Sequence, residues 1–127
     1  MAHQFGKFVW FELVTPNVAD AKAFWTEVGG FSTSDMEMGG NTYSMLASAK
    51  GQIGGVVAPQ AAGVPPHWTS YVSVPDVAAA AKKVVANGGK VLVPATDIGM
   101  GIFALVADPQ GATFNLSHTL DQMLHLR

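Results

Sequence analysis

The chain repeats itself at an interval of 59 residues, and this repeat is the feature that most limits the possible folds. Residues 16–30 and 75–89 share six identities, with a proline near the start and a Gly-Gly pair at the end. At an interval of 60 the similarity continues, because residues 43–51 fall opposite residues 103–111 with aromatic and apolar residues matched. We therefore expect two copies of one structural unit.

Each copy has the pattern of a β-α-β-β-β unit. Residues 8–14 are rich in aromatic and β-branched residues, which is typical of a strand. Asn17 is a favoured helix N-cap, apolar residues then follow helical spacing, and Gly29-Gly30 is a favoured helix end. The expected elements are strands over 8–14, 31–36, 42–47 and 52–58 with a helix over 18–28, then strands over 67–74, near 91, over 102–107 and over 112–117 with a helix over 76–87.

The two copies predict a single α+β domain over residues 1–127. Unit one covers about 7–58, a Pro/Gly/Ala linker covers 59–66, unit two covers about 67–118, and the tail over 119–127 has room for a short helix. One helix covers one face of each curved sheet, so the other face must pack on something or hold a ligand. Two units, paired within the chain or across a homodimer, would form a half-open barrel with a cup.

Composition excludes several classes of function. Charged residues make up 13% of the chain, against about 25% in an average protein, so part of the surface is expected to be a subunit interface of an oligomer. A net charge of -2 predicts binding to neither nucleic acid nor an anionic membrane. The chain has no cysteine, which excludes disulfides and thiolate metal sites. An N-terminus without an apolar signal segment predicts a cytoplasmic protein.

Three segments together resemble the vicinal oxygen chelate superfamily, the glyoxalase, bleomycin-resistance protein and extradiol dioxygenase group. They are the opening of unit one with its Thr15-Pro16-Asn17 and Phe24-Trp25, the opening of unit two over 67–77, and the Asp108-Pro109-Gln110-Gly111 hairpin. The resemblance covers residues 8–117. It implies a glyoxalase-like fold and a homodimer. In the enzymatic members it also implies a divalent metal in the cup, with one ligand on each first and each last strand.

The residues at the four implied ligand positions cannot replace the usual histidines and glutamates. The positions fall on Trp10 and Thr69, related by 59, and on Gly55 and Asn115, related by 60. Trp and Gly side chains cannot coordinate a metal, and Thr and Asn offer only neutral oxygens. We therefore predict no metal and no other cofactor at this place. A shifted divalent site that uses Glu12 and His67 is the alternative.

Other side chains on the same strands are candidates for a ligand site. Residues two apart in a strand share a face, so Glu12 is expected to point the same way as Trp10, and is a candidate general base. Trp10 itself could stack on a flat ligand or plug the cup. The predicted ligand-binding set is Trp10, Tyr43, Met45, His67, Thr69, Tyr71, Phe103 and Asn115.

Three functions fit these residues. The first is a protein that holds a small, largely apolar or aromatic organic molecule in a metal-free cup, for sequestration, resistance or transport. The second is an enzyme of the same superfamily, a lyase, isomerase or oxygenase. It would use either Glu12 as general base, helped by donors such as Thr69, Tyr71 or Asn115, or a shifted metal site. The third is a structural module with a plugged cup.

Overall fold

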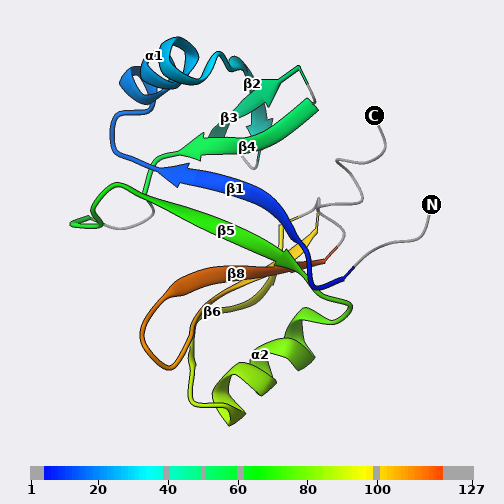
Figure 1. Ribbon diagram of the computed structural model, residues 1–127. Helices are drawn as coiled ribbons and strands as arrows, with labels where there is room; N and C mark the ends of the chain where they lie inside the picture. Colours follow the sequence, from blue (N-terminus) through cyan, green and yellow to red (C-terminus); the bar gives the residue numbers. More distant parts are fainter. Residues whose placement is uncertain (1–4, 39–40, 50, 60–61, 99–100, 119–127) are drawn as a thin grey trace. The chain divides into compact units, whose positions relative to one another are not determined.

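The computed structural model describes residues 5–38, 41–49, 51–59, 62–98 and 101–118 (Figure 1). Its elements follow the order β-α-β-β-β twice, as the repeat predicts. β1 and β5 are related by the predicted 59 residues, and the other elements follow the same order in both copies. The elements are β1 (Phe8–Val14), α1 (Val18–Gly29), β2 (Ser32–Met38), β3 (Asn41–Ser48), β4 (Gly51–Val57), β5 (His67–Ser73), α2 (Val77–Ala86), β6 (Lys90–Asp97), β7 (Ile102–Ala107) and β8 (Thr113–His118).

The helices begin and end where their capping residues predict. The Asn17 side chain accepts a hydrogen bond from the Asp20 backbone N–H, and Asp76 does the same for Ala79 at the start of α2. α1 ends at Gly29 and is capped by Gly30, whose φ of 69° is the left-handed conformation that glycine tolerates best. These local rules explain why both helices could be placed from sequence.

The chain divides into two compact units, and each is described by itself. The first unit comprises residues 11–69, and the second comprises residues 1–10 with residues 70–127. The boundary falls inside β1 and inside β5. The predicted short helix over 119–126 lies outside the described residues. Neither helix in the described segments is long and apolar enough to cross a membrane.

The first unit has a mixed sheet in the order β2-β3-β4-β1, with α1 on one face (Figure 1). β1 and β4 run parallel because α1 carries the chain back across the sheet, whereas β2, β3 and β4 form antiparallel pairs. The core between sheet and helix contains the buried Leu13, Leu46 and Val56. Trp25 of α1 packs against this core. Leu13, Leu46 and Val56 therefore face the helix, and the residues that alternate with them along β1, β3 and β4 face the other way.

The second unit repeats this plan with the order β5-β8-β7-β6 and α2 on one face. Its core contains Val77 and Ala81 of α2 with Ala104, Val106 and Leu116 of the sheet. The Asp108 carboxylate closes the hairpin before β8, because it accepts hydrogen bonds from the backbone N–H groups of Gln110 and Ala112. The two units therefore place equivalent strands in equivalent positions, as the repeat predicts.

Candidate functional site

Each sheet has one face that is turned away from its helix, called here the helix-free face. In the first unit the strand register puts Glu12, Gly55 and Met45 side by side on this face. Met45 is 5% exposed. The same register places these further neighbours of Glu12 on the helix-free face, all of them uncharged: Val14, Ser34, Met36, Tyr43 and Val57.

A tyrosine and a glutamate meet on this face across an intervening strand. The Tyr43 hydroxyl, from β3, donates a hydrogen bond of 2.9 Å to Glu12 Oε2, on β1. β4 lies between these two strands, so the phenol must cross it. It does so over Gly55, where a Cβ would lie within 2.1 Å of the tyrosine oxygen and 2.3 Å of its ring carbon Cζ. Glycine is therefore required at residue 55 for this hydrogen bond to form.

The helix-free face of the second unit carries neutral polar and aromatic side chains. Tyr71 lies beside Asn115, and Asn115 beside Leu105. Tyr71 and Asn115 are 8% and 3% exposed, and the Asn115 amide donates to the Ser70 backbone oxygen at 3.3 Å. Phe103 lies two residues before Leu105 on β7 and pairs with the fully buried Ser117 of β8. These residues offer apolar surface with a few hydrogen-bonding groups.

The residues at the four implied metal-ligand positions do not fit a divalent ion. Trp10, Thr69 and Asn115 are buried, and Gly55 is buried beneath Tyr43. None of the four supplies an imidazole or a carboxylate. In the described ranges, no three His, Asp or Glu side chains come together in a way that could hold a metal. No step that depends on a metal is therefore derived for this chain.

His67, the predicted partner of Glu12 in a shifted metal site, has a local contact. It starts β5, and its Nδ1 lies 2.8 Å from the Pro65 backbone oxygen. A carbonyl oxygen only accepts, so the imidazole proton is on Nδ1 in this contact. His67 is half-buried. The contact ties the ring to the turn that precedes the strand.

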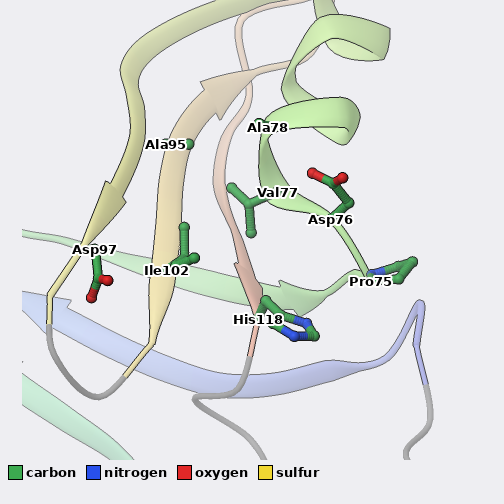
Figure 2. Close-up of a pocket in the computed structure, with 8 residues that line it drawn as sticks. All are labelled: Pro75, Asp76, Val77, Ala78, Ala95, Asp97, Ile102 and His118. Carbon is green, nitrogen blue, oxygen red and sulfur yellow. The ribbon is translucent and has the colours of Figure 1, made fainter.

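A pocket of about 350 Å³ lies in the second unit on the side of the sheet that carries α2 (Figure 2). Its polar groups have local structural partners: the Asp76 carboxylate caps α2, and His118 Nδ1 lies 3.0 Å from the Val74 backbone oxygen. It was not predicted from sequence, and it lies away from the helix-free face. Its lining residues are Pro75, Asp76, Val77, Ala78, Ala95, Asp97, Ile102 and His118.

One carboxylate in the first unit has a clearly shifted pKa. A hydrogen bond from the buried Ser44 hydroxyl, 2.8 Å from Asp35 Oδ1, lowers the pKa of Asp35 below its ordinary value of 3.8. The Lys22 ammonium of α1, 3.1 Å from the same oxygen, lowers that pKa further. This cluster lies on the helix side of the sheet, where it joins α1 to β2, so it supports the fold and not the candidate site.

The sequence singled out Gly55, but the reason for glycine at that position was missed. From sequence, residue 55 is only an implied metal-ligand position without a ligand side chain. The structure shows that the glycine there makes room for the Tyr43 phenol. Gly54 beside it is equally constrained, since a Cβ there would lie 2.2 Å from the Phe11 backbone oxygen. Two glycines inside a strand are a general sign of close approach, and that sign could have been used.

Two βαβββ units, each with one helix on one face of its sheet, define a class of proteins. The model of the Glyoxalase/Bleomycin resistance protein/Dioxygenase superfamily matches residues 7–116. The chain belongs to this superfamily, as its resemblance to the vicinal oxygen chelate group predicts.

Two curated relatives are similar to this chain. CFP32 of Mycobacterium tuberculosis, which carries a glyoxylase name, is 38% identical over 91% of the chain and 45% of its own length. The anthracycline biosynthesis protein DnrV of Streptomyces peucetius is 32% identical over 86% of the chain and 46% of its own length. The chain thus spans about half the length of the curated relatives it matches.

Solved structures of low sequence identity share the fold. Methylmalonyl-CoA epimerase from Streptomyces coelicolor, in complex with 2-nitronate-propionyl-CoA, has a TM-score of 0.62 and 15% identity. The alignment covers 91% of this chain and 96% of the epimerase. The methylmalonyl-CoA epimerase from Mycobacterium tuberculosis has a TM-score of 0.63 and 12% identity, over 90% of this chain and 88% of that one. These similarities support the α+β glyoxalase fold and say nothing about activity.

Proposed function

We propose that the protein holds a small, largely apolar or aromatic organic molecule against its helix-free sheet faces, without a metal. The observation that carries this proposal is the residue set at the implied metal positions, where Trp10, Gly55, Thr69 and Asn115 supply no metal ligand of the usual kind. What these faces offer instead is aromatic and thioether surface with a few polar groups, which suits an organic ligand. The superfamily includes a bleomycin-resistance branch, and sequestration or transport would use such a site.

Two further observations support this choice of ligand. Tyr43 and Tyr71 are 9% and 8% exposed, so each face supplies a buried tyrosine ring. Met45, next to the tyrosine–glutamate pair, is a residue type that adapts its shape to apolar partners. The similarity to an anthracycline biosynthesis protein favours a fused-ring aromatic compound over an aliphatic one.

The experiment is ligand screening with tryptophan emission and thermal unfolding as the two readouts. The chain has three tryptophans, so Trp25→Phe with Trp68→Phe leaves Trp10 as the sole reporter. Trp25 and Trp68 lie edge to face with ring centroids 5.3 Å apart, and their loss should not affect binding if Trp10 reports on the site. We expect an aromatic ligand to change Trp10 emission and raise the melting temperature. A library of apolar and aromatic compounds that does neither would refute the proposal.

A second candidate is an enzyme that uses Glu12 as a general base, and the Tyr43–Glu12 hydrogen bond favours it. A carboxylate held by a phenol at 2.9 Å has a defined position for proton transfer. If this candidate is right, Glu12→Gln lowers kcat about 10²–10⁴-fold, which is the usual contribution of such a base. A change in KM without a change in kcat would count against it. Lyase, isomerase and dioxygenase reactions remain the classes to screen.

We also propose that two copies associate. α1 has no buried residue, and Phe11, Phe24 and Trp68 of the first unit are 48%, 55% and 45% exposed. A cytoplasmic location stays a prediction, which cell fractionation would test.

A further inference from the structure

We infer that a groove between α2 and β6 binds a small amphiphilic anion, with its alkyl chain in the groove and its carboxylate at Lys82. The site lies in the second unit, on the side of the sheet that carries α2. It is distinct from the helix-free faces of the proposed function, so neither proposal depends on the other.

Two adjoining hollows make up this groove, called here the α2–β6 groove. The pocket of Figure 2 and a second hollow, also of about 350 Å³, share Ala78 of α2 and Ala95 of β6 in their linings. Each volume is at the lower end of the range for small-molecule sites, about 300–1,000 Å³. The apolar residues that line the second hollow are Ala78, Ala81, Val85, Val91, Pro94 and Ala95.

The irregular backbone of β6 forms one wall of the groove. β6 is an edge strand of the sheet, and its register with β7 shifts between Val91 and Val93 and again between Val93 and Thr96. Adjacent residues of a regular strand point to opposite faces, but a bulge re-aims them. Pro94 and Ala95 are adjacent in sequence, and both line the second hollow. The shifts thus give two successive residues to the apolar wall, and a proline is tolerated there because the strand is at the edge.

The lining favours an alkyl chain over an aromatic ring. Every apolar side chain of the second hollow is aliphatic, so none of them offers a ring for stacking. Three of them are alanines, which allow a chain to come close to the backbones of α2 and β6. Val85 is 58% exposed, so a ligand that covers it removes apolar surface from water, and this burial favours binding.

The charges around the groove set the kind of head group and its place. Among the described residues, Lys82 is the charged residue in the lining of the second hollow, and its ammonium group has no ion pair or hydrogen bond there. α2 contains no aspartate or glutamate that could pair with it. Asp76 lines the other hollow, so an anionic head group at that end would lie beside a carboxylate. The carboxylate of a ligand is therefore directed to Lys82, and its chain toward Ala78 and Ala95.

Three probes with the same linear eight-carbon skeleton test this preference. Octanoate, octanol and octylamine carry an anionic, a neutral and a cationic head group at pH 7. Titration followed by backbone amide NMR measures each affinity and locates the residues that respond. We expect shifts centred on α2 and β6. Octanoate should bind about two- to fivefold more tightly than octanol, which is the usual effect of a solvent-exposed ion pair, and octylamine should bind most weakly.

Substitutions of Lys82 test the role of its charge. Lys82→Gln should bind octanoate and octanol with similar affinity, and Lys82→Glu should prefer octylamine. The control is Lys83→Gln, which removes the next charge along α2 from a residue outside the lining of both hollows. It should keep the wild-type preference for octanoate.

A larger side chain at Ala78 tests the position of the alkyl chain. Ala78 lines both hollows, so Ala78→Leu should weaken the binding of all three probes together. Ala79→Leu is the matched control, since Ala79 is also exposed on α2 and lines neither hollow. It should bind the probes as the wild-type protein does. Circular dichroism shows whether each variant folds, and the Lys82 variants decide if Ala78→Leu does not.

Several outcomes would overturn the inference. Equal affinity of the wild-type protein for octanoate and octanol would do so, and so would a preference for octanoate that survives in Lys82→Gln. Binding of none of the three probes, or shifts centred away from α2 and β6, would remove the site. A wild-type dimer that becomes monomeric in Ala78→Leu would assign the groove to a second copy of the chain. The proposed function is tested separately, by Trp10 emission with aromatic compounds.

Discussion

The Tyr43 hydroxyl and the Glu12 carboxylate are joined by a hydrogen bond of 2.9 Å, although they lie on strands that are not neighbours in the sheet. The strand between them supplies Gly55, the one residue type that leaves the path open. In the superfamily's enzymatic members this position is expected to hold a metal ligand. In this chain the Tyr43 phenol lies over Gly55 and reaches Glu12. The predictions below concern this pair and the rest of the fold.

Removing the tyrosine hydroxyl should cost stability. In Tyr43→Phe the half-buried Glu12 carboxylate loses a donor, and we expect the free energy of unfolding to fall by about 1–3 kcal/mol. Urea denaturation measures the change. Thr42→Val is the control, since it removes an exposed hydroxyl from the neighbouring residue and should cost no more than about 0.5 kcal/mol. Equal losses in the two variants would show that the Tyr43 hydrogen bond has no special role.

The protein should contain no stoichiometric metal. Untagged protein purified without chelator, then incubated with nickel, zinc, manganese or iron(II) and desalted, should show only background metal in elemental analysis, because the described part of the chain contains no cluster of three His, Asp or Glu side chains that could hold a metal. The melting temperature should not change with EDTA. Near-stoichiometric, tightly held metal would contradict this, and would point to Glu12 and His67 as a shifted site.

The indole of Trp10 should contribute to stability. Its side chain is 3% exposed, so Trp10→Ala should lower the free energy of unfolding by about 3–5 kcal/mol. Trp68→Ala is the comparison, because Trp68 is 45% exposed and should cost much less. If Trp10→Ala leaves stability unchanged, the plugged structural module is excluded. If the loss is found and no aromatic ligand binds the wild-type protein, the plugged module replaces the proposed function.

Acid should weaken the link between α1 and β2. The pKa of Asp35 is lowered in the folded state, so its contribution to stability is present above the ordinary pKa of 3.8 and is lost as the pH falls through the lower, folded value. Ser44→Ala removes the largest cause and should raise this pKa toward 3.8. A carboxyl NMR titration measures it, with Ser34→Ala on the opposite sheet face as the control. An Asp35 pKa that is the same in Ser44→Ala and in the wild-type protein would refute the assignment.

Self-association should depend on the exposed aromatic residues of the first unit. Light scattering coupled to size-exclusion chromatography should give a dimer mass for the wild-type protein and a larger monomer fraction for Phe24→Ser. Val85→Ser on α2 is the control, since Val85 is likewise exposed, at 58%. A wild-type protein that is monomeric at all concentrations tested would refute the proposed dimer. A dimer unchanged in Phe24→Ser would place the interface elsewhere.

Sequence alone determined most of the local structure of this protein. The 59-residue repeat gave the order of the elements, and caps such as Asn17, Asp76 and Gly30 set the helix limits, because capping and strand periodicity depend on residues within a few positions of one another. The same repeat related the implied metal positions to one another in pairs, and the residues there supply no imidazole or carboxylate. It also placed Glu12 on the same strand face as Trp10.

Only the tertiary structure decided which side chains meet at the implied metal positions. Tyr43 is 31 residues from Glu12 along the chain, and their contact depends on the parallel register of β1 with β4 and the antiparallel register of β3 with β4. A shift of either register by one residue would move the side chains of that strand to the other face. Pattern rules do not specify register across a helical crossover, so the Tyr43–Glu12 pair over Gly55 could be found only in three dimensions.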